Sequence, residues 1–224
     1  MWPRATQFLE SLPPNSIVAD VGCGDGKYFA AGWANGHFVI GSDMSMELLK
    51  CTLGGTGGGR DERQKAYDES GDSRRAEVFG GDILNIALRD EVADAVICIA
   101  VLHHISTRGR RVRCLEELKR IVKVGGMIDI QAWALEQAKE SKRQFKSQDL
   151  HVPFKAQPRY LSSESSERGG GVADDKNGLV TFDRYCHVYR EGELVELARE
   201  VEGLEVVECG WDSGNHYVRL KRLA

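Results

Sequence analysis

Residues 17–26 read IVADVGCGDG, an apolar run that ends in three alternating glycines. Short apolar runs bounded by turn residues are typical of strands buried on both faces of a parallel sheet. Gly22, Gly24 and Gly26 allow a tight turn and bring the backbone close to a ligand where a Cβ would clash. We therefore predict a strand, a ligand-binding loop and a helix in succession. In the dinucleotide fingerprint G-x-G-x-x-G the third glycine comes one residue later, so a plain tight turn remains an alternative.

The rest of the chain continues this alternation. Further strands are predicted from short apolar runs at residues 37–41, 76–79, 93–100 and 127–130. Apolar residues at helical spacing predict helices over residues 112–122 and 194–201. Residues 204–209 and 216–220 are close enough to form a C-terminal hairpin. Strands that alternate with helices predict a doubly wound α/β fold.

Composition narrows the class of protein. The chain has 224 residues, of which 42% are hydrophobic and 29% charged, so we predict a single soluble domain over residues 1–224. Polar, glycine- and serine-rich segments at about 54–75 and 156–178 predict mobile insertions within it. Six scattered cysteines without C-x-x-C spacing predict no metal site. The net charge of −4 excludes a strongly basic nucleic-acid binder but not local basic patches.

The expected location follows from what the sequence does not contain. No apolar run approaches the roughly 18 residues that span a bilayer, so we expect no membrane association. The N-terminus lacks the apolar stretch of a signal peptide. We therefore expect a cytoplasmic protein, with the nucleus as a second location.

Three aspartates stand at the ends of the first three predicted strands. Asp20 precedes the glycine loop, Asp43 ends the second strand and Asp82 follows the third. A carboxylate at the second strand can accept both hydroxyls of a ribose, and Asp82 would lie near an adenine edge. A lone aspartate at a strand end also serves as a helix cap or turn residue.

This pattern resembles the S-adenosylmethionine-dependent methyltransferases of the Rossmann-like class I fold, over about residues 16–132. The resemblance implies S-adenosyl-L-methionine as cofactor and a mainly parallel seven-stranded sheet with an antiparallel C-terminal hairpin strand. The glycine loop would hold the amino-acid end of the cofactor, Asp43 the ribose, and Asp82 the adenine side. The cofactor-binding residues it implies are Asp20, Gly22, Cys23, Gly24, Gly26, Asp43, Met44, Asp82, Ile83 and Ala100.

Later stretches look like the eukaryotic tRNA wobble-uridine methyltransferases, which esterify 5-carboxymethyluridine. The stretches that carry this resemblance are IAVLHH at 99–104, AWALEQ at 132–137 and RYCHVYREGEL at 184–194. The resemblance implies two partners: the anticodon stem-loop of a tRNA, and a small zinc-binding activator subunit that adds a strand near residues 78–83. Cys186 stands where the family pattern has an aromatic residue, and that pattern has a longer segment before Trp2.

The chemistry of the expected substrate fits a site that orients rather than deprotonates. A carboxymethyl group is ionised near neutral pH, since free carboxyl groups titrate near pH 4, so no general base is required. We predict that the pocket around the uridine contains His104, Trp133, Arg184, Tyr185 and His187. Trp133 would stack on the base, and Arg184 would pair with the carboxylate or a phosphate. The alternatives are a capping histidine, a core tryptophan and a solvated arginine.

Two other functions stay open from the sequence. A small-molecule methyltransferase on the same fold is favoured by the acidic balance of the chain. A catalytically silent, cofactor-binding scaffold is favoured by the short segment before Trp2 and opposed by the intact glycine loop. Three basic stretches, at residues 108–113, 139–146 and 219–222, would meet phosphates if the substrate is a tRNA.

Overall fold

The computed structural model describes residues 1–54, 77–141, 143–156, 172–174 and 179–224. The strands of its larger sheet are β1 (Ile17–Val21), β2 (Phe38–Asp43), β3 (Glu77–Gly80), β4 (Ala93–Ile99), β5 (Val122–Trp133), β9 (Leu204–Asp212) and β10 (Asn215–Arg222). The helices are α1 (Pro3–Ser11), α2 (Phe29–Ala34), α3 (Met46–Gly54), α5 (Arg108–Ile121) and α7 (Glu193–Arg199), with a 3₁₀ turn, η1 (Leu102–His104).

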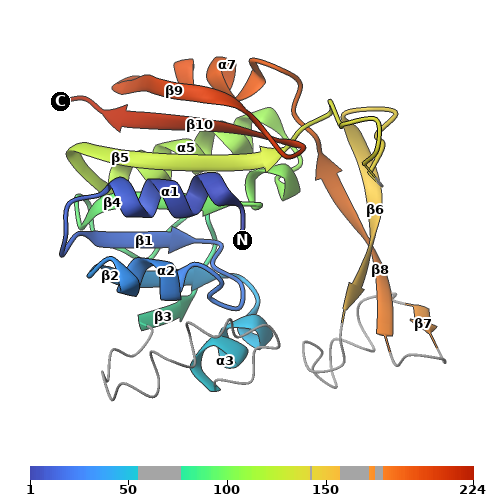
Figure 1. Cartoon of the computed structure of the whole chain (residues 1–224), viewed down its shortest axis with the longest axis horizontal. Helices are drawn as coiled ribbons and strands as arrows, with labels where there is room; N and C mark the ends of the chain where they lie inside the picture. The colour runs from blue at the N-terminus through green and yellow to red at the C-terminus, as the bar shows by residue number, and fades with distance from the viewer. Residues whose placement is uncertain (55–76, 142, 157–171, 175–178) are drawn as a thin grey trace.

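The seven strands follow the order β3-β2-β1-β4-β5-β10-β9 (Figure 1). Strand β1 pairs in parallel with β2 on one side and with β4 on the other. Strand β10 runs antiparallel to both β5 and β9, so the C-terminal strands form the expected hairpin. The predicted fold class is therefore confirmed. Strand β5 is longer than the apolar run that predicted it, because antiparallel pairing with β10 extends it to Trp133.

The core has two layers, one on each face of the sheet. Side chains alternate between the faces along β4. Ala95 and Ile97 pack with residues of α1 and α2, whereas Val96 and Cys98 pack with residues of α5 and α7. Figure 1 shows α1 and α2 on the near face and α5 behind the sheet. Both faces of the parallel strands are thus buried, as the apolar runs predicted.

A second, three-stranded antiparallel sheet was not predicted. It consists of β6 (Asp149–Ala156), β7 (Val172–Asp174) and β8 (Leu179–His187), in the order β6-β8-β7. It projects beside the carboxyl ends of the parallel strands (Figure 1). The Tyr189 N–H donates to the Trp133 carbonyl and the Leu135 N–H to the Tyr189 carbonyl, each at 2.8 Å. These bonds join the end of β8 to the end of β5.

Most of the two predicted insertions lies outside the described residues. Of the first, only Gly54 is described, at the end of α3. Of the second, Ala156 ends β6 and residues 172–174 form β7. The single-domain organisation stays a prediction. No helix in the described ranges combines the length and apolar character needed to cross a bilayer.

Candidate active site

The glycine loop links β1 to α2 in the conformation that its sequence predicts. Gly22, Gly24 and Gly26 all have positive φ angles, of 82°, 58° and 75°, a region that other residues enter only with strain. The N–H groups of Gly22 and Cys23 donate to the Ser42 carbonyl at 2.7 and 3.0 Å. The loop is therefore fastened to the end of β2.

Asp43 holds the loop and the next helix together. Its Oδ2 accepts a hydrogen bond from the Gly24 N–H at 2.9 Å, and its Oδ1 accepts one from the Ser45 N–H at 2.7 Å. Asp43 thus has the turn role that sequence analysis left as an alternative. Each carboxylate oxygen keeps a second lone pair, so the same side chain can also accept ribose hydroxyls.

Asp20 is a buried acid with an unused acceptor. It is 1% exposed, and its Oδ2 has no hydrogen-bond partner among the described residues. Burial, together with the charge of Asp43, raises its pKa to about 8. A buried oxygen of this kind favours a ligand that brings a cation or hydrogen-bond donors.

A cavity of about 930 Å³ opens at the carboxyl ends of β1, β2 and β4. Predicted cofactor residues that line it are Asp20, Gly22, Cys23, Gly24, Asp43, Met44, Ile83 and Ala100. Ala100 has a φ of 62°, which is unusual for a residue with a Cβ. Strained backbone of this kind concentrates at functional sites.

Two predicted cofactor residues do not line the cavity. Asp82 is exposed, and its Oδ1 accepts a hydrogen bond from the Leu84 N–H at 2.9 Å within a turn. That turn directs the neighbouring Ile83, rather than Asp82, toward the cavity. Gly26 lies behind the loop, where an added Cβ would be 2.8 Å from the Thr52 side chain. Its role is close packing against α3.

Both His103 and His104 line the cavity, although only His104 was predicted as a pocket residue. His104 Nδ1 lies 3.2 Å from the Tyr185 carbonyl oxygen. Burial, followed by the positive charge of Arg184, lowers the pKa of His104 to about 4. Burial also lowers the pKa of His103 well below its usual value. Both rings are therefore neutral at pH 7.

The ring of Trp133 lines the cavity but is covered by protein groups. His103 stacks on it at a centroid distance of 4.6 Å, and Phe145 does so at 6.0 Å. The Arg143 guanidinium lies over the ring at 4.5 Å. A base can stack on Trp133 only by displacing one of these neighbours.

Arg184 reaches the cavity from the second sheet, as does Phe154. The Arg184 guanidinium lies 4.5 Å from the Phe154 ring centroid, and its Nε has no hydrogen-bond partner among the described residues. Arg143 also lines the cavity, although sequence analysis placed it only within a basic stretch. Neither Phe154 nor Arg143 was predicted as a pocket residue, because contacts between segments far apart in the chain bring them to the cavity.

Tyr185 and His187 point away from the cavity. Tyr185 donates from its hydroxyl to Asp149 Oδ1 and to the Ser106 carbonyl. His187 lies between two carboxylates, with Nδ1 2.9 Å from Asp149 Oδ1 and Nε2 2.7 Å from Glu193 Oε1. The two residues do share one face of β8, but the opposite face carries Arg184 to the cavity. The structure does not bring them together with the other predicted site residues.

Comparison with known proteins assigns this chain to a family. A profile described as a methyltransferase domain matches residues 19–130, which contain the glycine loop and strands β2 to β4. The tRNA (carboxymethyluridine(34)-5-O)-methyltransferase of Schizosaccharomyces pombe is 32% identical, over 97% of this chain and 86% of that protein. This chain belongs to the tRNA carboxymethyluridine methyltransferase family. The corresponding Xenopus tropicalis protein, alkbh8, is also 32% identical, over 99% of this chain but 38% of its own length.

Several relatives in this methyltransferase family are much longer proteins. The chain spans about a third of the length of the Xenopus, Arabidopsis and human relatives that it matches. Among solved structures, the complex of the Haloferax volcanii Trm112 methyltransferase activator with a methyltransferase is similar in fold. Its TM-score is 0.61 at 16% identity, over 98% of this chain and 89% of that chain. The family profile ends before the second sheet, so Arg143, Phe154 and Arg184 lie outside it.

Proposed function

We propose that this protein transfers a methyl group from S-adenosylmethionine to the carboxylate of 5-carboxymethyluridine at the wobble position of tRNA. The observation that carries the proposal is one continuous cavity with two chemically different ends. The glycine loop, Asp20 and Asp43 form one end, and Arg143 and Arg184 form the other. A cofactor that carries an ammonium and a ribose suits the first end, and an anionic acceptor suits the second.

The cofactor is S-adenosyl-L-methionine, which supplies an activated methyl group on a sulfonium. The residues present fit it, because the unpartnered Asp20 oxygen is a buried acceptor for its ammonium and donors. Asp43 has lone pairs left for the ribose hydroxyls. Ile83 and Met44 give apolar contact to the adenine side of the cavity. This set contains the predicted residues that line the cavity; Gly26 and Asp82 do not line it.

The acceptor carboxylate needs orientation rather than activation. A carboxylate oxygen forms the new bond to the methyl carbon as the carbon–sulfur bond breaks, and no proton is transferred. His104 stays neutral, with a pKa of about 4, and serves as a wall of the pocket and a hydrogen-bonding group. Arg184 holds the carboxylate by charge. Tyr185 and His187 act indirectly, because their bonds to Asp149 and Glu193 fix the strand that carries Arg184.

A basic surface near the cavity is available for the tRNA backbone. Two of the three basic stretches are largely neutralised by acids, as in the pairs of Arg108 with Glu200 and of Arg222 with Glu91. Within the described part of the chain, Lys139, Arg143 and Lys146 form no ion pair. Their stretch leads from β5 to β6 beside the cavity mouth, so it is the basic stretch best placed to meet phosphates.

The third strand is the proposed docking edge for a small activator subunit. Strand β3 lies at one edge of the seven-stranded sheet, and an uncovered edge is open to strand addition. The similarity in fold to the methyltransferase of the Trm112 complex supports this arrangement. The anticodon stem-loop would then enter from the opposite side, where the second sheet lies.

The test is to incubate the purified protein with S-adenosylmethionine and tRNA that carries 5-carboxymethyluridine, with and without the activator subunit. Nucleoside mass spectrometry should show the methyl ester in the presence of the activator. Arg184→Ala should reduce the yield at least tenfold while the affinity for S-adenosylhomocysteine stays unchanged. Arg190→Ala is the matched control, because Arg190 is an exposed residue paired with Glu196. Ester formation on free carboxylic acids but not on tRNA would favour the small-molecule alternative, and cofactor binding without any transfer would favour the scaffold.

A further inference from the structure

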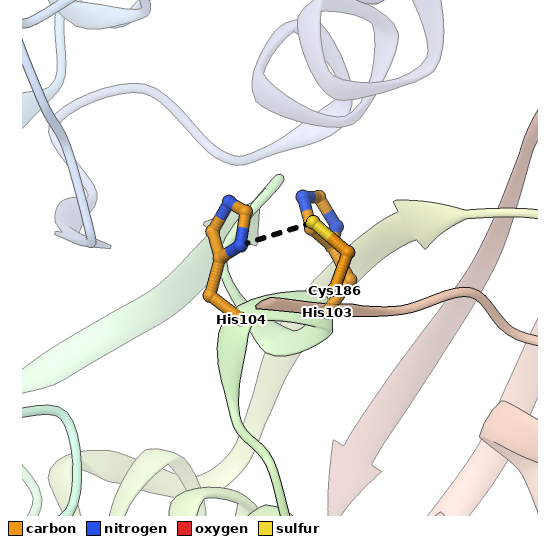
Figure 2. A group of neighbouring side chains, drawn as sticks. All are labelled: His103, His104 and Cys186. Atoms are coloured by element: carbon orange, nitrogen blue, oxygen red, sulfur yellow. Dashed lines mark hydrogen bonds between the residues drawn. The ribbon is translucent and has the colours of Figure 1, made fainter. Parts of the chain in front are cut away.

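Three potential metal ligands meet beside the cavity, and two of them, both histidines, line it. His103 and His104 lie on η1, and Cys186 lies on β8 (Figure 2). One donor atom from each lies within 4.8 Å of the other two. The Cys186 Sγ is 3.5 Å from His104 Nδ1. This proximity joins residues more than 80 positions apart, and it depends on the contact between β8 and η1.

The strand phase of β8 creates the cluster. Tyr185 and His187 are turned toward Asp149, so Arg184 and Cys186 lie on the other face of β8. There Arg184 lines the cavity and Cys186 contacts His104. The two imidazole rings lie 4.2 Å apart and are inclined by 70°. In Figure 2 both rings and the sulfur stand on the same side of the backbone segments that carry them. The arrangement therefore presents nitrogen and sulfur donors toward one point.

We propose that His103, His104 and Cys186 bind a thiophilic divalent cation of the Zn²⁺ class. Four-coordinate zinc uses imidazole nitrogen at about 2.0–2.1 Å and thiolate sulfur at about 2.3 Å, which places donor atoms roughly 3.3–3.7 Å apart. The spacing between Cys186 and His104 already falls in this range, and the widest spacing needs to contract by about one ångström. The set supplies three protein ligands and leaves the fourth position for water or an oxygen ligand from the cavity.

The local chemistry agrees with this choice of ion. Two nitrogens and one sulfur select zinc-like ions over Mg²⁺ or Ca²⁺, which prefer oxygen. A neutral imidazole has one nitrogen lone pair. To bind the ion through Nδ1, His104 moves its proton to Nε2 and gives up its hydrogen bond to the Tyr185 carbonyl. His103 gives up the hydrogen bond that its Nδ1 accepts from the Trp133 N–H. The Cys186 thiol must lose its proton to water when the metal–sulfur bond forms. Burial raises the pKa of this thiol, while the nearby Arg184 lowers it in part.

The test is a titration of the whole protein with Cd²⁺ alone, under a phosphine reductant, followed by the ultraviolet thiolate-to-Cd²⁺ band. The wild type should bind one Cd²⁺ per chain, and Zn²⁺ should remove the band by competition. Cys186→Ser should abolish the band and weaken binding at least tenfold. His104→Gln should keep the band and also weaken binding at least tenfold. Cys209→Ser is the matched control, because Cys209 is the exposed cysteine among the described residues.

Several results would overturn the proposal. If the wild type shows no thiolate-to-Cd²⁺ band at one Cd²⁺ per chain, the site is excluded, and no variant is needed for this conclusion. A band that survives Cys186→Ser, or that disappears in Cys209→Ser, would place the thiolate elsewhere. Unchanged affinity in His104→Gln would exclude His104 as a ligand and with it the three-ligand site. Thermal melting of each variant without metal separates loss of binding from loss of folding, and Cys186→Ala replaces Cys186→Ser if the latter unfolds.

Discussion

Replacing Asp20 by Asn should remove a pH dependence from cofactor binding. Burial and the charge of Asp43 raise the pKa of Asp20 to about 8, so most molecules carry a protonated Asp20 near pH 7. If the cofactor ammonium requires the ionised form, affinity follows the ionised fraction. That fraction rises from roughly 1% at pH 6 to roughly 24% at pH 7.5, a gain of about 25-fold or about 1.9 kcal/mol.

The assay is isothermal calorimetry with S-adenosylhomocysteine, which keeps the amino-acid end and is chemically stable. The wild type should bind about 25-fold more tightly at pH 7.5 than at pH 6 and should release a proton to the buffer. Asp20→Asn should show nearly constant affinity over the same range. Asp25→Asn is the matched control, because Asp25 also lines the cavity and should preserve the wild-type slope.

A flat wild-type profile would refute the reasoning, since it would mean that Asp20 is ionised without the cofactor or does not meet it. The stability of the free protein gives an independent check. A carboxyl group whose pKa is raised in the folded state stabilises the fold below its unfolded pKa of about 4. This contribution decreases as pH rises from about 4 to about 8, so Asp20→Asn should flatten the free energy of unfolding over that window.

Three further predictions concern the loop, the histidine and the second sheet. Gly22→Ala places a Cβ 2.2 Å from Val101 Cγ2 at a φ of 82°, so urea unfolding should show that the free energy of unfolding falls by more than 2 kcal/mol. The control is Gly36→Ala, where φ is positive but no atom lies near the added Cβ, and the fall should be about 1 kcal/mol. At saturating cofactor, the single-turnover rate of methyl transfer should be constant from pH 6 to pH 8, because His104 has a pKa of about 4. A rate that instead increases through about pH 6.5, and that loses this increase in His104→Asn, would show that His104 acts as a general base. Burial raises the pKa of Glu193, but hydrogen bonds, the largest from His187, bring it below its usual value. His187→Gln should therefore cost stability above about pH 4.5 and little below it, by chemical unfolding at both pH values.

The cofactor end of the site could be predicted from the sequence because its signals are local. The run over residues 17–26 sets a strand, a turn and a helix through residues that are neighbours in the chain, and Gly24 has the positive φ that its glycine allows. Asp43 ends a strand whose parallel pairing with β1 follows from its apolar character. Asp82 lies in a turn, and its neighbour Ile83 lines the cavity, so the contact of Asp82 with the adenine side stays a prediction.

The substrate end depended on strand phase, which the sequence alone left undetermined. In a strand, a shift of one residue exchanges the two faces, and the pattern over residues 184–187 is polar on both. Pairing with Asp149 settles the phase in the structure, so Arg184 reaches the cavity and Cys186 meets His104, while Tyr185 and His187 lie on the opposite face of β8.

The amino-acid sequence by itself determined the strands of the seven-stranded sheet and the glycine loop, and its resemblance to a known family implied the type of cofactor. The strands and the loop depend on periodicity or spacing over a few neighbouring residues. Only the tertiary structure decided which side chains cover Trp133, which residues meet His104 and how far burial raises the pKa of Asp20. These properties arise from contacts between segments far apart in the chain and from the exclusion of water between them, and neither is encoded in local spacing.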